Sequence, residues 1–265
     1  MPARSVRTAL VAVAIVVAGV AAVAAAAAFD VDAQTASPML AAAPPAPSAV
    51  SSEQVARTPT RRSIGRPTSG PFGARLVRTV MLRDRPGGRI LRAIGPRTEF
   101  GSQRVLAVVE QRPGWLGVLT HHVANSRTAW IPANGAKILF EPYTLHADLS
   151  QRTLVVRREG RIERRITVAI GSTATSTPTG RFAVTDALVI GRAGGPYGCC
   201  ALALTGRQPN VPQGWAGGDR LAIHGTQNES TLGMPVSSGC LRASENDMRW
   251  LIATVPLGSQ LRIQA

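Results

Sequence analysis

Two segments near the end of the chain decide how it is interpreted: His224-Gly225-Thr226 and Ser237-Ser238-Gly239-Cys240-Leu241-Arg242. A cysteine nucleophile needs a base, because a free thiol has a pKa of about 8.5 and stays mostly protonated near neutral pH. His224 is a candidate base, since imidazole titrates close to neutral pH. Gly239 lets the backbone turn tightly, and the N–H groups of Gly239 and Cys240 are candidates for an oxyanion hole. The segments therefore predict nucleophilic catalysis by Cys240.

Cys240 and His224 also have an ordinary structural interpretation. A lone cysteine is usually a small buried apolar residue, and a lone histidine is usually a surface or core residue with a satisfied hydrogen bond. For Cys240 considered alone, the structural interpretation as a small buried apolar residue is preferred. The spacing of sixteen from His224 to Cys240 (240 − 224), together with Ser237, Gly239 and Arg242, favours catalysis instead.

The combined motif resembles that of the L,D-transpeptidase catalytic domains, the YkuD-like family of bacterial cell-wall enzymes. The family pattern is His-Gly-Thr, a flap, then Ser-His-Gly-Cys, an aliphatic residue and Arg or Asn. The chain matches the second part at Ser237, Gly239, Cys240 and Arg242. Ser238 replaces the commonest residue, histidine, which we interpret as a change in the substrate groove. The resemblance extends to Thr177–Phe182 and Tyr197-Gly198 and covers roughly residues 140–265.

The resemblance implies a mainly β catalytic domain over residues 138–265, a β-sandwich or barrel with a short helix. It implies a peptidoglycan stem tetrapeptide as substrate, cut after its third residue. No cofactor is predicted, and no metal site is predicted because the chain has no Cys-x-x-Cys spacing. The Cys240 thiolate would attack the carbonyl, and His224 would pass the proton to the leaving D-alanine. The side-chain amine of a second stem would then attack the thioester and give a 3→3 cross-link. Carbapenem β-lactams are the implied inhibitors.

Further site residues follow from the resemblance. Ser237 is expected to orient His224 or the loop. Arg242 either binds a substrate carboxylate or forms a bridge to an acid such as Asp247. Substrate contacts are also expected from Tyr197, Gly225, Thr226 and Ser238. Tyr197 alternatively braces its loop, and Thr226 alternatively has a purely structural role.

Three other functions remain open at this stage. Water as the acceptor would make the protein an L,D-carboxypeptidase. A papain-like endopeptidase also uses Cys and His, but its cysteine precedes its histidine, whereas His224 precedes Cys240. A non-catalytic wall-binding protein would instead use a module in the first half of the chain.

The composition limits the possible partners. The chain has 265 residues and a formal net charge of +15, which suits nucleic acid, anionic lipid or an acidic wall polymer. It has no basic helix with interleaved aromatic residues and no zinc-finger spacing, so no nucleic-acid partner is predicted. The only cysteines are Cys199, Cys200 and Cys240, and the odd number leaves a free thiol. The adjacent pair can form a vicinal disulfide or pack as small apolar groups, and packing is favoured.

The beginning of the chain reads as an export signal. Arg4 and Arg7 precede an uncharged run over residues 8–29. A signal peptide within residues 1–33 and an uncleaved membrane anchor are about equally compatible with this run. Either places the rest of the chain outside the cytoplasm, in the periplasm or cell wall. Residues 34–73 are rich in Ala, Pro and Ser and are predicted to be a disordered linker.

Residues 74–137 are predicted to form a small β module. The stretches Gly114–Val118 and Ala129–Pro132 resemble the final strands of bacterial SH3-like domains. Trp115 and Trp130 can stack on a wall sugar or peptide, but at least one of them is expected to fill the core. His121 and His122 follow in a polar stretch and are expected to be solvated.

Secondary structure in the second half is predicted from alternating apolar residues. Strands are expected near residues 154–156, 166–170, 182–190, 221–223 and 261–263. The strand over residues 221–223 would deliver His224. Ser244 is expected to cap a short helix over residues 245–252, with Asp247 in its first turn.

Overall fold

The computed structural model describes residues 71–190, 195–210 and 218–265. The predicted export segment lies outside these residues, as does nearly all of the predicted linker. Within the described part of the chain, no helix is both long and apolar enough to cross a membrane. The described residues form two large β-sheets and a short α-helix, so the prediction of a mainly β chain is confirmed.

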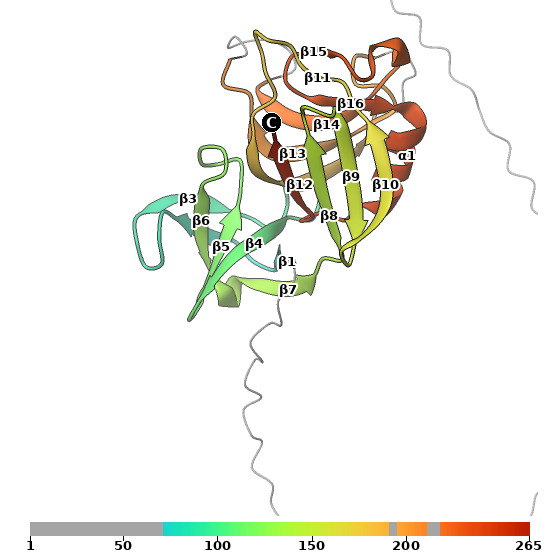
Figure 1. Ribbon diagram of the computed structural model, residues 1–265. Helices are drawn as coiled ribbons and strands as arrows, with labels where there is room; N and C mark the ends of the chain where they lie inside the picture. Colours follow the sequence, from blue (N-terminus) through green and yellow to red (C-terminus); the bar gives the residue numbers. More distant parts are fainter. Residues whose placement is uncertain (1–70, 191–194, 211–217) are drawn as a thin grey trace, which may run out of the picture. The chain divides into compact units, whose positions relative to one another are not determined.

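The first sheet is antiparallel, with its strands in the order β3-β2-β6-β5-β4-β1-β7 (Figure 1). The strands are β1 (Phe72–Leu76), β2 (Val80–Arg83), β3 (Ile90–Ile94), β4 (Val105–Arg112), β5 (Trp115–Leu119), β6 (Thr128–Pro132) and β7 (Ala136–Phe140). Side chains alternate between a buried and an exposed face, as in β2, where Val80 and Leu82 are buried and Met81 is exposed. The buried side chains, Leu76 and Ile131 among them, form one small core.

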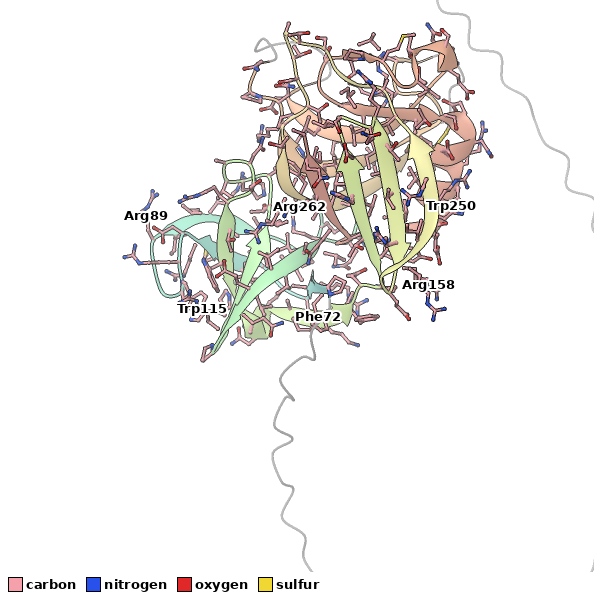
Figure 2. All side chains as sticks on the ribbon, viewed as in Figure 1. Phe72, Arg89, Trp115, Arg158, Trp250 and Arg262 are labelled. Atoms are coloured by element: carbon pink, nitrogen blue, oxygen red, sulfur yellow. A yellow bond between two sulfur atoms is a disulfide. The ribbon has the colours of Figure 1, made fainter. Side chains whose placement is uncertain are left out.

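Both tryptophans of this sheet lie under arginines. Trp130 is buried, whereas Trp115 is half-buried. Figure 2 labels Trp115 on β5. The guanidinium of Arg112 lies 5.4 Å from the Trp130 ring centroid, and that of Arg83 lies 5.9 Å from the Trp115 centroid. These are cation–π distances. The expectation that at least one tryptophan is a core residue is confirmed by Trp130.

The second sheet is a nearly closed, barrel-like sheet in the order β10-β9-β8-β17-β12-β13-β14-β16 (Figure 1). Its strands are β8 (Tyr143–Asp148), β9 (Thr153–Arg158), β10 (Arg161–Thr167), β12 (Gly180–Val189), β13 (Cys200–Arg207), β14 (Arg220–Thr226), β16 (Leu241–Ser244) and β17 (Gln260–Gln264). The pairs β8–β17 and β14–β16 are parallel, and the other pairs are antiparallel. A separate parallel pair joins β11 (Ile170–Gly171) to β15 (Pro235–Ser237).

The core of the second sheet is lined on one side by helix α1 (Glu245–Thr254). Ser244 caps this helix as predicted, because its side-chain oxygen accepts a hydrogen bond from the Asp247 N–H at 3.1 Å. Met248 and Leu251 on α1 are fully buried in the same core as Ile223. The helix therefore packs against the inner face of the strands that carry the predicted site.

The two large sheets meet through a small apolar contact and a polar network. Ala183 of β12 packs with Ala107 and Leu119 of the first sheet. Glu99 forms an ion pair with Arg220 of β14 and lies 3.5 Å from His121 Nε2.

His121 is 7% exposed, so the prediction that it is solvated is wrong. Burial, with a further contribution from the Arg220 cation, lowers the pKa of His121 to about 3. The ring lies in the polar network between the sheets, which a sequence pattern for one sheet does not reveal.

A second buried titratable group is Glu141, directly after β7. Its side chain is 4% exposed, and a Cβ added at Gly73 would lie 2.7 Å from its Oε1. Burial raises the pKa of this carboxyl from 4.5 to about 7. The pKa of Glu141 is higher in the folded protein than in the unfolded chain. The contribution of Glu141 to the free energy of unfolding is therefore complete below about pH 4.5 and is lost as the pH rises through about 7.

Glu141→Gln should therefore stabilise the protein at alkaline pH, because the amide stays neutral where the buried carboxyl ionises. We expect the free energy of unfolding to rise by about 1–3 kcal/mol at pH 8 and to change little at pH 5. Urea denaturation at the two pH values measures this difference. Glu110→Gln, which alters an exposed carboxyl, is the matched control and should show no such pH dependence. A gain of equal size at both pH values would contradict the raised pKa.

Candidate active site

The candidate site lies on the outer face of three neighbouring strands. His224 of β14 pairs in register with Ala201 of β13 and with Arg242 of β16, which places the three side chains in one row. Ile223 and Leu241, one position away, point into the core. Since side chains alternate along a strand, the row faces away from the core.

Cys240 directly precedes β16 and lies next to Ala222 of β14, two positions from His224. The thiol and the imidazole therefore share one face of adjacent strands, as the sequence predicts. The Cys240 thiol is half-buried, and its Sγ lies 3.9 Å from the backbone oxygen of Arg220, within the range of an S–H hydrogen bond. Cys240 is the free cysteine of the chain.

His224 is held in one tautomer by its own turn. The side chain is 3% exposed, and Nδ1 lies 2.8 Å from the carbonyl oxygen of Gly225. A carbonyl can only accept, so Nδ1 carries the proton and Nε2 keeps its lone pair. The Tyr197 ring meets the imidazole edge-to-face, with 5.1 Å between the centroids. This geometry leaves Nε2 as the nitrogen that can take a proton.

The electrostatics keep both groups neutral at neutral pH. The pKa of His224 is lowered to about 4, mainly by burial and also by the Arg242 cation, while the hydrogen bond with Gly225 acts in the opposite direction. Burial also raises the pKa of the Cys240 thiol, against smaller lowering effects from the Ala222 backbone and Arg242. A neutral thiol therefore faces a neutral imidazole, not a preformed thiolate–imidazolium pair.

Two hydrogen bonds brace the loop that carries the nucleophile. Ser237 Oγ donates to the Cys240 carbonyl at 2.6 Å and accepts the Gly239 N–H at 3.1 Å. Of the two roles expected for Ser237, the structure therefore supports bracing of the loop. Because the Gly239 N–H is bonded to Ser237 here, it is not aimed at a substrate oxygen as the sequence suggests.

Gly239 is instead required by backbone geometry. Its φ is +113°, and a Cβ added there would lie 2.2 Å from Nε2 of Gln208. Gln208 is itself pinned, because Nε2 donates to the carbonyls of Thr175 and Ser176 at 3.1 and 2.9 Å. The turn before Cys240 therefore tolerates no side chain.

Gly239→Ala should displace the nucleophile without unfolding the protein. We expect turnover to fall by about a hundredfold, since a misplacement of about 1 Å can cost that much. Gly195→Ala is the matched control, because a Cβ at Gly195 meets nothing within 4 Å. Circular dichroism and turnover of a stem peptide measure the two effects. Full activity in the Gly239 variant would show that this turn does not position Cys240.

Glu245, the first residue of α1, is a site residue that the sequence analysis missed. Its carboxylate accepts the Cys199 N–H at 3.0 and 3.1 Å. Cβ atoms added at Gly198 and Gly225 would lie 2.0 and 2.5 Å from its Oε1. Glu245 thus ties the helix to the Tyr197 loop and to β14. The sequence signal was the pair of glycines, each beside a predicted site residue.

The adjacent cysteines form a disulfide, Cys199–Cys200, so the expectation that they pack as separate thiols is wrong. Cys200 does lie in the core, with 3% of its surface exposed. Cys199 is half-buried and held by Glu245, which keeps both residues at one end of β13. Sequence spacing cannot distinguish the two states, because neighbouring residues are close in any conformation. The free thiol inferred from the odd cysteine count is confirmed at Cys240.

The remaining predicted residues lie around this pair. Arg242 does not bridge to Asp247, which pairs with Arg164 at 2.7 Å. Thr226 is buried, and its Oγ1 accepts the Asn228 N–H at 3.2 Å, which fits the structural alternative. Ser238 is half-buried beside the nucleophile. No group of three or more potential His, Cys, Asp or Glu metal ligands occurs in the described part of the chain.

Comparison with known proteins identifies the family. The L,D-transpeptidase catalytic domain family, YkuD, matches residues 142–263. YqjB from Bacillus subtilis strain 168, named as an L,D-transpeptidase, is 32% identical over 134 residues, which cover 46% of this chain and 71% of YqjB. The chain belongs to the YkuD family of L,D-transpeptidase catalytic domains. The family resemblance drawn from the cysteine and histidine segments is thus confirmed.

Other YkuD relatives match the same half of the chain. YkuD of Bacillus subtilis strain 168 is 30% identical over 125 residues, and this chain spans 66% of its length. YkuD of Bacillus licheniformis is 31% identical over 122 residues, with the same share of its length spanned. Both matches cover 46% of the present chain. The first sheet lies outside the YkuD match.

Solved L,D-transpeptidases are also similar. One from Mycobacterium tuberculosis H37Rv has 18% identity and a TM-score of 0.40, and covers 52% of this chain and 72% of its own. The L,D-transpeptidase LdtMt1, solved in complex with imipenem, has 18% identity and a TM-score of 0.40. The match covers 62% of this chain and 92% of LdtMt1.

Proposed function

We propose that this chain is a peptidoglycan L,D-transpeptidase that forms 3→3 cross-links through a thioester on Cys240. One observation carries the proposal: in a chain of the YkuD family, a free thiol and a histidine with an unprotonated Nε2 share one face of β14 and β16. This chemistry is assigned to the domain predicted over residues 138–265. No catalytic role is proposed for the module predicted over residues 74–137.

The first half-reaction transfers the acyl group to sulfur. The Cys240 thiol passes its proton to His224 Nε2 while Sγ attacks the carbonyl of the third stem residue. The new C–S bond converts the carbonyl to a tetrahedral oxyanion. When the C–N bond to D-alanine breaks, His224 returns the proton to the leaving amine. The products are a thioester on Cys240 and free D-alanine.

The second half-reaction releases the enzyme. The side-chain amine of a second stem attacks the thioester carbonyl, and His224 accepts its proton. The C–S bond breaks, and the proton returns to sulfur. One amide is broken and one is formed, so no external energy source is needed. Water in place of the amine would give the tripeptide and make the protein an L,D-carboxypeptidase.

The neutral resting pair shapes this mechanism. Since the pKa of His224 is lowered and that of Cys240 is raised, charge separation between the two groups is unfavourable. Proton transfer therefore accompanies attack on the carbonyl. Arg242, in register with His224, favours the thiolate and disfavours the imidazolium. A carboxylate bound by Arg242 would weaken both effects, which couples substrate binding to the basicity of His224.

Incubation of the purified chain with stem-tetrapeptide fragments tests the function. Mass spectrometry should show free D-alanine and a dimer with a 3→3 linkage. Tripeptide without dimer would identify the carboxypeptidase. Binding to peptidoglycan with no product of either kind would favour the non-catalytic wall-binding alternative, and Cys240→Ala would then bind as well as the unsubstituted chain.

We further propose that residues 34–265 lie outside the cytoplasm, because residues 8–29 form an uncharged run behind two arginines. The proposed substrate lies in the same compartment. A reporter fused after Ala265 that works only outside the cytoplasm should be active. N-terminal sequencing of the mature protein would then separate a cleaved signal peptide from a retained anchor.

A further inference from the structure

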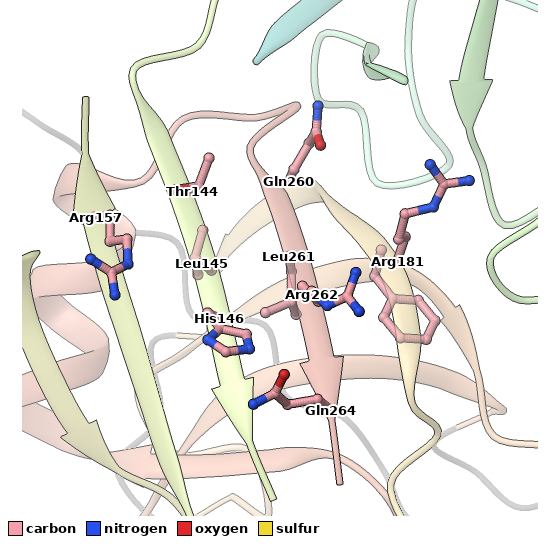
Figure 3. Close-up of a pocket in the computed structure, with 10 residues that line it drawn as sticks. Thr144, Leu145, His146, Arg157, Arg181, Gln260, Leu261, Arg262 and Gln264 are labelled. Atoms are coloured by element: carbon pink, nitrogen blue, oxygen red, sulfur yellow. The ribbon is translucent and has the colours of Figure 1, made fainter. Parts of the chain in front are cut away.

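A basic groove lies on the outer face of the second sheet, on different strands from the active site. A hollow of about 410 Å³ is formed over β9, β8, β17 and β12 (Figure 3). An adjoining hollow of about 390 Å³ over β9 and β10 shares His146 and Arg157 with it. The basic groove is defined here by five side chains: Arg157, Arg165, Arg181, Arg262 and His146.

Strand register aligns most of these side chains in one row. Arg181 of β12 lies directly opposite Arg262 of β17, which is paired in turn with His146 of β8. The row continues through Val155 to Arg165. Figure 3 shows Arg181, Arg262 and His146 on successive strands. Like charges directly opposite one another destabilise a sheet, so the pairing of Arg181 with Arg262 does not contribute to the stability of the fold.

The charge of the basic groove is not neutralised from within the described residues. None of its four arginines lies within 4 Å of a carboxylate there, whereas Arg164 on the same hairpin pairs with Asp247 at 2.7 Å. The lining includes one acid, Asp148, whose carboxylate is bonded to Ser150, Gln151 and Gln264. The guanidinium groups of the basic groove are therefore available to an anionic ligand.

We propose that the basic groove binds the free carboxylates of peptidoglycan stem peptides next to the one that reacts at Cys240. This rests on the proposed function, which makes peptidoglycan the substrate. Stem peptides repeat along a glycan strand and carry free carboxylates, and the planar guanidinium fork matches a carboxylate with two parallel hydrogen bonds. Basic side chains spread across five neighbouring strands, with adjacent strands about 5 Å apart, suit a polymer with repeated anions better than one small ligand.

Neutral side chains in the groove favour a peptide over a phosphate polymer. Thr144, Gln260 and Gln264 line the same hollow. Hydroxyl and amide groups can donate to and accept from peptide amides, which a phosphodiester chain does not have. Binding away from Cys240 would hold the polymer while individual stems enter and leave the site, so affinity for the wall would exceed affinity for a single stem.

The test compares two variants of the full chain that lose the same charge. The groove variant is Arg157→Gln/Arg181→Gln/Arg262→Gln. The matched control is Arg85→Gln/Arg89→Gln/Arg112→Gln, with side chains 75%, 77% and 63% exposed. Arg85 and Arg89 lie in the turn between β2 and β3, where Figure 2 labels Arg89, and Arg112 ends β4. Binding to purified peptidoglycan is measured by co-sedimentation in a Cys240→Ala background, so that turnover does not alter the polymer. Turnover of a soluble tetrapeptide is measured separately with Cys240 intact.

We expect the groove variant to bind peptidoglycan about tenfold more weakly, with the control changed less than about twofold. Soluble tetrapeptide turnover should be the same in both. Equal losses in both variants would overturn the proposal and leave only general surface charge. Binding that disappears from unsubstituted protein once phosphate polymers are stripped from the wall would also overturn it. Absence of tetrapeptide turnover in the unsubstituted chain would contradict the proposed function. The comparison of peptidoglycan binding would still decide the role of the basic groove.

Discussion

Cys240→Ala is expected to abolish turnover of stem tetrapeptides, with a loss of about a thousandfold or more. Every covalent step of the proposed mechanism passes through its sulfur. The fold should persist, because the residue is half-buried at the edge of the core and its neighbours pack without it. Release of D-alanine measures the activity, and circular dichroism and the melting temperature measure the fold.

Thiol titration supplies a control within the same variant. With Cys199 and Cys200 joined, the unsubstituted chain has one free thiol and Cys240→Ala has none. Ser150→Ala, at an exposed position just after β8, should retain turnover. Undiminished activity in Cys240→Ala would refute the mechanism outright. A remaining reactive thiol would show that the disulfide is open.

His224→Ala should produce a loss comparable to that of Cys240→Ala, because a thiol with a raised pKa needs a base to accept its proton. The pH profile adds a sharper check. Since His224 must be neutral to accept a proton, and its pKa is lowered to about 4, activity should persist at pH 5 and fall only below that. Arg242→Gln removes a cation that lowers this pKa, so it should move the acid limb to higher pH.

The sequence predicted the mainly β fold and the helix because both have local signals. Ser244 caps the helix, and Asp247 follows in its first turn. Alternation of apolar residues identified β9, β14 and β17. It did not identify β13, Cys200–Arg207, whose Ala- and Leu-rich sequence has little β propensity. This strand is central because β12 and β14 flank it, a tertiary relation that no local pattern contains.

The candidate site could be predicted in its reacting groups but not in its supports. Cys240 and His224 follow from residue types and spacing. Gln208 and Glu245 act through contacts 31 and 20 positions away in the chain, against Gly239 and Gly225. Their sequence context is ordinary, so only the fold reveals that they fix the two glycine turns. The polar network around Glu99 and Arg220 was missed for the same reason.

The second large effect is acylation by a carbapenem, expected to inactivate the protein completely. A β-lactam is a strained acyl donor, so opening its ring supplies the driving force that a stem peptide lacks. The Cys240 Sγ attacks the lactam carbonyl, the C–N bond of the ring breaks, and the nitrogen takes the proton that His224 accepted from the thiol. Nothing leaves, so the adduct has the mass of protein plus drug.

Deacylation should be slow, because the leaving nitrogen stays tethered and blocks the position that an acceptor amine would occupy. Intact-protein mass spectrometry should show one adduct, and peptide mapping should place it on the peptide that contains Cys240. Cys240→Ala should show none. Ser238→His, which introduces the commonest family residue beside the nucleophile, should change the rate of acylation but not its position. An adduct on Cys199 or Cys200, or no adduct on folded protein after long incubation, would contradict the transpeptidase mechanism, since any thiol poised to acylate at Cys240 should open this ring.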